Sequence, residues 1–96
     1  MTSNIRLVIS AQARAQIEDI GQYTLKIWGS GQRGIYDQIL DDAFHLIQQF
    51  PDIGHPAEGQ PSNVREYHLR HHVIQYRREP ERVVILRIVN PRRRRR

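Results

Sequence analysis

The sequence predicts an α+β domain, in which an N-terminal strand and an antiparallel two-helix hairpin pack on an antiparallel β-sheet. Three observations predict it: apolar residues recur with helical spacing over residues 11–50, they alternate as in strands over residues 64–89, and a Pro- and Gly-rich segment separates the two regions. With 96 residues and no cysteine, the chain has room for one modest core and no disulfide. We therefore expect a single domain over residues 1–91.

The N-terminal third of the chain predicts a strand and then a helix. Apolar alternation over residues 5–9 indicates the strand, and Ser10 stands where a helix N-cap is expected. The helix over residues 11–28 has one apolar stripe, formed by Ala13, Ile17, Ile20, Thr24 and Ile27. Trp28 closes this helix, and we expect it to fill the core between helix and sheet rather than to anchor an interface.

A second helix is predicted from about residue 32 to residue 50. Gly29-Ser30-Gly31 ends the first helix and reverses the chain, and Pro51 ends the second. The apolar stripe of this helix consists of Tyr36, Ile39, Ala43, Leu46 or Ile47, and Phe50. A connection this short makes the two helices an antiparallel hairpin.

The remaining residues predict a connector over 51–62 and strands over 64–70, 72–78 and 82–89. The segment Glu79-Pro80-Glu81 joins the last two strands as a hairpin. Simple alternation divides the last strand between two faces. Val84, Leu86 and Ile88 fall on one face, and Val83, Ile85, Arg87 and Val89 fall on the other.

The net charge of +5 depends on the end of the chain. Residues 92–96 are five arginines, and without them ten basic residues balance ten acidic ones. We expect this tail to be solvated and mobile, and to provide the only direct route to nucleic acid. The sequence has neither a basic-then-apolar leader nor an apolar run long enough to span a bilayer, so a cytoplasmic location without membrane attachment is expected.

No cofactor or metal is expected from the motifs. Residues 29–34 spell G-x-G-x-x-G, but a predicted helix precedes them where a dinucleotide site needs a strand. His68 and His72 are four residues apart, a spacing that would serve on a helix but falls here on a strand and a turn. Glu66 is the only carboxylate nearby in the sequence, so a metal site is not predicted.

The stretch from residue 65 to 77, with Arg87, combines cations and aromatics on predicted strands. Arg65 and Tyr67 share one face, as do His72 and Tyr76, and an outward Arg87 would gather them on one surface. Arginine suits bidentate contacts with carboxylate or phosphate groups. The alternative is cross-strand pairing with acidic neighbours, namely Glu66, Glu79 and Glu81, on a solvated face.

The order of these features resembles the ParE branch of the ParE/RelE toxin superfamily. The resemblance runs from about Leu7 to Arg93 and is carried by Tyr23, Trp28-Gly29, Tyr36, Pro51-Asp52-Ile53-Gly54, Arg65-Glu66-Tyr67, the run from His72 to Arg77, and Ile85-Leu86-Arg87-Ile88. It implies the toxin half of a type II toxin–antitoxin pair, neutralised by a ParD-like antitoxin. It further implies a non-enzymatic inhibitor of DNA gyrase, with no catalytic residues.

On this resemblance, antitoxin or target contacts are expected at Arg65, Tyr67, Arg70, His72, Tyr76, Arg87, Arg92 and Arg93. We expect the antitoxin to add a strand and to cover a groove between the first helix and the sheet. The chain departs from the ParE pattern at the end of its last strand, where Asn90-Pro91 and arginines replace a His and a following Asp.

Two other functions stay open. A RelE-like ribosome-dependent ribonuclease would need an acid/base group, and no Tyr or His follows Tyr76, which leaves His68 or His72. A nucleic-acid-binding module acting through the arginine tail is the third reading.

Overall fold

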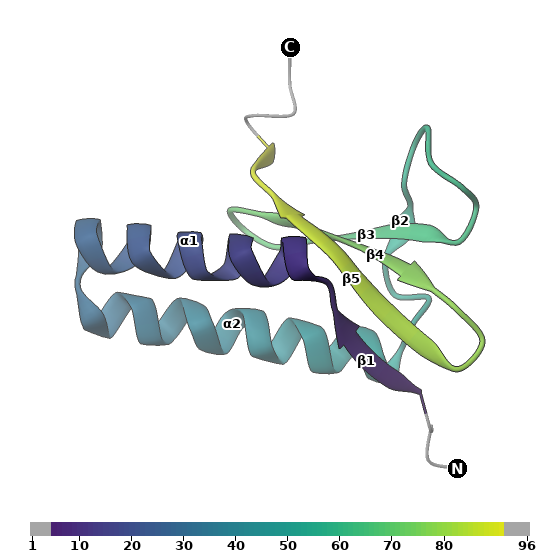
Figure 1. Ribbon diagram of the computed structural model, residues 1–96, viewed down its shortest axis with the longest axis horizontal. Helices are drawn as coiled ribbons and strands as arrows, with labels where there is room; N and C mark the ends of the chain where they lie inside the picture. Colours follow the sequence, from purple (N-terminus) through teal and green to yellow (C-terminus); the bar gives the residue numbers. More distant parts are fainter. Residues whose placement is uncertain (1–4, 92–96) are drawn as a thin grey trace.

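A computed structural model describes residues 5–91 of the chain (Figure 1). The elements are β1 (Arg6–Ile9), α1 (Ala11–Trp28), α2 (Ser30–Gln49), β2 (His55–Pro56), β3 (Val64–His68), β4 (Val73–Arg78) and β5 (Arg82–Val89). This arrangement confirms the predicted α+β class and the helical hairpin. The predicted strands extend one or two residues too far at residues 69–70 and 72, and β2 lies inside the segment predicted as a connector.

The five strands form one sheet in the order β1-β5-β4-β3-β2. The pairs β2–β3, β3–β4 and β4–β5 are antiparallel. Strand β1 pairs with β5 in parallel, so the sheet is mixed rather than antiparallel throughout as expected. The two helices connect β1 to β2 in the chain, and these two strands lie at opposite edges of the sheet.

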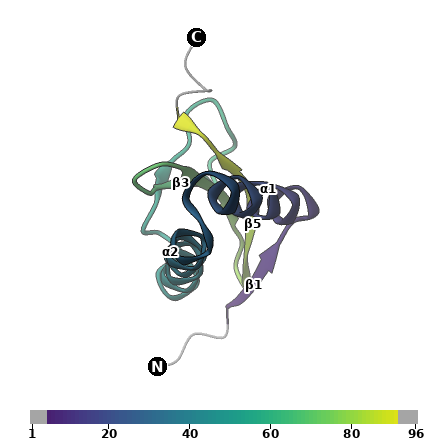
Figure 2. The same cartoon turned by 90° about the vertical axis from the view of Figure 1, so that its left-hand side faces the viewer.

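Both helices pack on one face of the sheet, and their hairpin projects beyond it (Figures 1 and 2). The core brings helix residues together with residues of β4 and β5. Its buried members are Ala13, Tyr36, Leu40, Ala43, Phe44, Ile47, Ile74, Tyr76, Val83, Ile85 and Ile88. We call this side of the sheet, which carries Ile74, Tyr76 and Ile85, the helix face, and the opposite side the outer face.

Ser10 caps α1 as predicted and also ties the helix to the sheet. Its Oγ accepts a hydrogen bond from the Ala13 backbone N–H at 3.0 Å and donates one to the Leu86 carbonyl at 2.8 Å. The Ser10 N–H donates to the Ile85 carbonyl at 3.0 Å. The start of the hairpin is therefore fixed to β5 by one residue.

The turn between the helices is a single residue, Gly29. Its φ of 95° lies in the region that favours glycine, its N–H donates to the Leu25 carbonyl, and its carbonyl accepts from the Arg33 N–H. Because Gly29 completes both helices, α2 begins at Ser30, two residues earlier than predicted. The G-x-G-x-x-G letters therefore lie at a junction of two helices.

The far end of the hairpin is apolar and exposed. Trp28 is 69% exposed, so its predicted place in the core is wrong. The reason is reach, because the last turns of α1 extend past the sheet and have only α2 beside them. The predicted stripe residues Ile27, Ile39 and Phe50 are exposed as well, whereas Leu40 and Phe44, outside the predicted stripe, are buried.

Within residues 5–91, no helix is both long and apolar enough to cross a membrane.

A β-bulge at Leu86 changes the faces of the last strand. Gln75 pairs with Arg87 while its neighbour Tyr76 pairs with Ile85, which leaves Leu86 as the extra residue of β5. Val83 and Ile85 therefore belong to the core before the bulge and Ile88 belongs to it afterwards. The simple alternation predicted for this strand fails at Leu86, and Arg87 moves to the face opposite Ile85.

Candidate partner-binding surfaces

The predicted binding residues lie on both faces of the sheet. Residues paired across neighbouring strands share a face, so the pairs Arg65 with Tyr76 and Tyr67 with Ile74 belong to the helix face. Arg87 pairs with Gln75, which pairs with Glu66, and these belong to the outer face. The expectation that all these cations and aromatics form one surface is therefore wrong.

Tyr76 is fully buried, which rules out the predicted surface contact. Its hydroxyl donates to the Pro51 carbonyl at 2.7 Å and accepts from the Gly54 N–H at 2.9 Å. Arg65 acts on the same segment, because its Nε donates to the Gly54 carbonyl at 2.7 Å and its Nη2 to the Asp52 carbonyl at 3.2 Å. Burial raises the pKa of the Tyr76 hydroxyl, which therefore stays protonated. Arg65 and Tyr76 together hold the segment that follows α2.

The turn between β3 and β4 carries Arg70 and His72. Arg70 is exposed. His72 is half-buried, and its Nδ1 lies against the hydroxyl of Tyr36 on α2, with the two rings tilted and 5.4 Å apart. Tyr67 is half-buried and packs against the core. Of these predicted contacts, Arg70 presents the freest charge to a partner.

The Tyr36–His72 pair was not predicted as a unit. Burial raises the pKa of Tyr36 to about 12, so its hydroxyl stays protonated beside the His72 ring. Burial, followed by the charge of neighbouring His71, lowers the pKa of His72, so its ring is neutral near pH 7. The stripe position of Tyr36 was visible in the sequence, but its partner lies 36 residues away in the chain and only the fold brings them together.

The outer face carries a chain of polar side chains across three strands. Arg87 Nη1 donates to the Gln75 amide oxygen, and Gln75 Nε2 donates to Glu66 Oε2 at 3.1 Å. Glu66 is 4% exposed and Gln75 is 7% exposed. His55 and His68 stack beside Glu66 with ring centroids 5.0 Å apart. The sequence did not predict a role for His55, which lies on this face because it is the cross-strand partner of Glu66.

Arg77 and Arg82 meet at the β4–β5 hairpin. Both guanidinium groups donate to the carboxylate of Glu79, Arg77 at 2.6 Å and Arg82 at 2.5 Å. These hydrogen bonds, that of Arg82 first, lower the pKa of Glu79. The acidic pairing weighed as an alternative therefore occurs, but at the hairpin and between residues other than the predicted site arginines.

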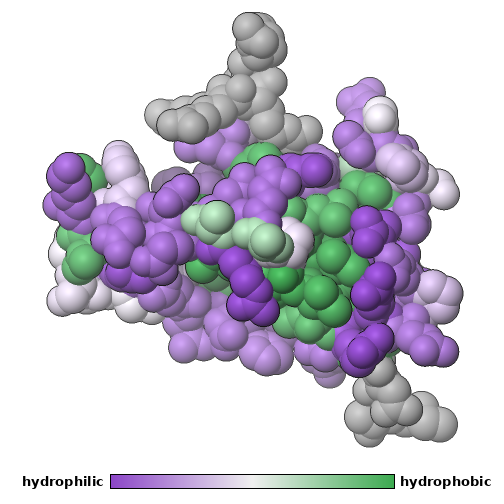
Figure 3. Space-filling view, viewed as in Figure 1, coloured by the Kyte–Doolittle hydropathy of each residue, from purple (hydrophilic) through white to green (hydrophobic). Residues whose placement is uncertain are grey.

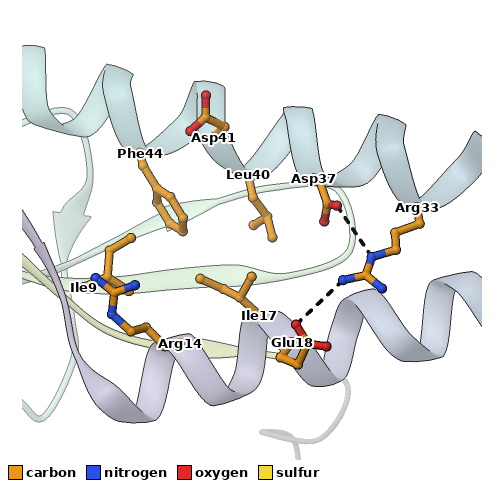
Figure 4. A pocket seen from close by; sticks show the side chains of 9 residues that line it. All are labelled: Ile9, Arg14, Ile17, Glu18, Arg33, Asp37, Leu40, Asp41 and Phe44. Atoms are coloured by element: carbon orange, nitrogen blue, oxygen red, sulfur yellow. Dashed lines mark ion pairs between the residues drawn. The ribbon is translucent and has the colours of Figure 1, made fainter. Parts of the chain in front are cut away.

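A groove runs between α1 and α2, where Figure 4 shows Ile17, Leu40 and Phe44 pointing into the gap. Its volume is about 350 Å³, and its lining is Ile9, Arg14, Ile17, Glu18, Arg33, Asp37, Leu40, Asp41 and Phe44. Arg33 crosses the groove, with Nη2 3.7 Å from Glu18 and Nε 3.6 Å from Asp37. An apolar floor with a charged rim thus lies between the helices and continues to Ile9 of the sheet.

The groove reaches the edge of the sheet at Ile9, the last residue of β1. An edge strand offers backbone groups for a further strand. Strands β1 and β5 also supply partly exposed apolar side chains, Val8 and Leu86 among them, and Figure 3 shows a hydrophobic area over these strands with hydrophilic side chains around it. Arg92 and Arg93 lie outside the described residues.

Comparison with solved structures identifies the fold as that of toxins from toxin–antitoxin systems. A chain of the chromosomal ParDE toxin–antitoxin system from P. aeruginosa aligns with a TM-score of 0.77 and 19% identity, over 91% of this chain and 96% of that one. A chain of the RelBE2 toxin–antitoxin complex from Mycobacterium tuberculosis aligns with a TM-score of 0.68 and 17% identity, over 94% of each chain.

Sequence comparison then gives the family. Residues 7–95 match the family model described as the ParE toxin of the type II toxin–antitoxin system parDE. Toxin ParE1 of Caulobacter vibrioides is 30% identical over 82 residues, which is 85% of this chain and 84% of the relative. The chain belongs to the ParE toxin family of type II toxin–antitoxin systems, as the resemblance implied.

Proposed function

We propose that the chain is a cytoplasmic toxin that inhibits DNA gyrase without chemistry of its own and is neutralised by a ParD-like antitoxin. One observation carries the non-enzymatic part. Cleavage of RNA needs a proton-transfer group and a cation close to one phosphate. His72 contacts Tyr36 on the helix side, whereas Arg87 of the last strand bonds to Gln75 on the outer face, so these two groups are not placed to act on one phosphate.

Inhibition of gyrase is tested with the purified chain, relaxed plasmid and gyrase. We expect supercoiling activity to be lost as the toxin concentration rises. Arg70 is exposed in the β3–β4 turn and Arg87 is half-buried on the outer face, so both remain proposed target contacts. Arg70→Glu should then weaken inhibition, with Lys26→Glu in the last turn of α1 as the matched charge reversal. Full supercoiling at large toxin excess would remove gyrase as the target.

The antitoxin is expected to use the groove between α1 and α2 and the edge of β1. The groove's apolar floor suits the apolar face of a helix, and the adjoining edge suits an added strand. An acidic antitoxin segment would find Arg14 exposed on the rim. Arg65 and Tyr67, which the resemblance implied as partner contacts, are half-buried and remain proposed contacts.

The groove is tested by binding to a ParD-like protein, which is to be sought in the reading frame beside the toxin gene. Arg14→Glu should weaken the complex at least about tenfold, as loss of a charge-assisted contact does. Lys26→Glu makes the same charge change on the same helix about 18 Å further along, given the rise of 1.5 Å per residue, and should bind normally. Equal binding by both variants and the unchanged toxin would place the antitoxin elsewhere.

Ribonuclease activity is the second candidate, favoured by the Tyr36–His72 contact. A neutral imidazole with a hydroxyl beside it is a competent proton-transfer group near pH 7. Mapping of mRNA ends on translating ribosomes separates this function from gyrase inhibition. New cuts that disappear in His72→Ala would replace the gyrase proposal.

A further inference from the structure

We propose that His55, Glu66 and His68 form a binding site for one divalent transition-metal ion of the zinc type. Each of the three residues offers a ligand atom, and these atoms lie within 4.8 Å of one another. Two imidazoles and a carboxylate are a ligand set that zinc accepts with a fourth position left for water. The same set disfavours magnesium and calcium, which prefer oxygen ligands alone.

The backbone fixes the three positions on one face of the sheet. His55 on β2 is the direct cross-strand partner of Glu66 on β3, and His68 follows Glu66 by two residues on the same face. Glu66 Oε1 lies 3.8 Å from His68 Nε2. Tetrahedral ligands about 2.1 Å from one zinc ion lie about 3.4 Å apart, so closure needs only small rotations of two exposed imidazole rings.

Hydrogen bonds around the three residues suit a ligand set. The Nδ1 atom of His55 lies 3.1 Å from the Pro56 carbonyl, and a proton donated there leaves Nε2 free for a metal. Gln75 Nε2 holds Glu66 Oε2 at 3.1 Å, and Arg87 in turn holds Gln75, which leaves Oε1 directed toward His68. Such outer contacts orient metal ligands and fix imidazole tautomers.

The segment that bears His55 is itself held firmly. Gly54 is clamped on both sides, by Tyr76 at its N–H and by Arg65 at its carbonyl. The Ala57 N–H donates to the Val64 carbonyl at 2.9 Å on the other side of His55. A site whose ligands are placed before binding loses less entropy when the ion arrives.

The test uses the full chain without a histidine tag, freed of metal with a chelator and titrated with zinc in a calorimeter. We expect one equivalent to bind. His55→Ala, His68→Ala and Glu66→Gln should each lower the affinity at least about tenfold, since each removes one of three ligands. His45→Ala is the matched control, because His45 is exposed on α2 and contacts Asp41 there.

Two further readouts keep the result independent of folding defects. Cobalt substitution should give the intense visible bands of a four-coordinate ion, and these should weaken in the three ligand variants. Zinc should raise the melting temperature of the unchanged chain but not of the His55→Ala/His68→Ala double variant. Absence of stoichiometric zinc binding by the folded chain, or equal losses in His45→Ala and His55→Ala, would overturn the proposal.

Discussion

The two faces of the sheet use the same kinds of residue for different purposes. On the helix face, Arg65 and Tyr76 bond to backbone groups of residues 51–54 and fasten the chain where it leaves α2. On the outer face, Arg87 bonds to side chains, and the network ends at Glu66 beside two histidines. Arg65 therefore holds a loop in place, and Arg87 holds a network of polar side chains.

The difference follows from register rather than from composition. Arg65 and Glu66 are adjacent in sequence and point to opposite faces because successive strand residues alternate. Arg87 would share the face of Val83 and Ile85 under strict alternation, but the bulge at Leu86 turns it to the outer face. The type of a residue therefore indicates which hydrogen bonds its side chain can make, and the pairing of strands decides on which face of the sheet it makes them.

Replacing Tyr76 with alanine should have the largest effect. The side chain is fully buried and holds both Pro51 and Gly54, so Tyr76→Ala should reduce the free energy of unfolding by about 3–5 kcal/mol. Tyr76→Phe keeps the ring and removes only the hydroxyl, with an expected loss of about 1–3 kcal/mol. Urea unfolding measures both. A loss below 1 kcal/mol for Tyr76→Ala would mean that the helix face does not depend on this clamp.

Gly54→Ala should also lower the free energy of unfolding, because Gly54 is held against the helix face. A Cβ at Gly54 would lie 2.6 Å from the Glu66 carbonyl oxygen and 2.8 Å from the Tyr76 hydroxyl, so backbone must move, at a cost of about 1–3 kcal/mol.

Gly34→Ala is the matched control for Gly54→Ala. Gly34 lies inside α2 with nothing within 4 Å of a Cβ, so alanine should stabilise the helix by about 0.5–1 kcal/mol. Thermal and urea unfolding of the two variants should therefore shift in opposite directions. If Gly54→Ala stabilised the chain as Gly34→Ala does, the close approach at Gly54 would be relieved without strain.

Double-mutant cycles test whether the two faces are energetically separate. Arg65→Leu and Tyr76→Phe act on the same backbone segment, so their effects on unfolding should be coupled by about 0.5–3 kcal/mol. Arg65→Leu and Arg87→Leu lie on opposite faces and share no partner, so their effects should add to within about 0.5 kcal/mol. Strong coupling in the second cycle would contradict the energetic separation of the helix face from the outer face.

Local rules predicted most of the fold. Ser10 is the cap that the sequence indicates, and the helical hairpin and the turn at residues 79–81 occur where expected. The parallel pairing of β1 with β5 has no local signal, because the partners are 76 residues apart in the chain. Trp28 was misplaced because an apolar stripe does not say where the sheet beneath the helix ends.

The candidate surfaces were less predictable. Arg70 is exposed, as a binding residue must be, but Tyr76 is buried. Arg87 changes face at a bulge, and the alternation of apolar residues in this strand gives no sign of that bulge. The cluster around Glu66 depends on His55, whose short strand lies within a segment rich in Pro and Gly. The residues before this strand are held by Arg65 and Tyr76, which is a tertiary effect.

The smallest expected effect concerns pH and the Tyr36–His72 contact at the margin of the helix face. Burial, and then the charge of His71, lowers the pKa of His72 below its usual value near 6.5. As the pH falls below about 6.5, the unfolded chain takes up a proton at this position before the folded chain does, so folding stability declines. His72→Gln should make the unfolding free energy, measured in urea between about pH 8 and pH 5, less sensitive to acid. The unchanged chain, measured over the same pH range, gives the reference slope. If His72→Gln kept that slope, the acid sensitivity would have to arise at other groups, and the neutral imidazole beside Tyr36 would not contribute to it.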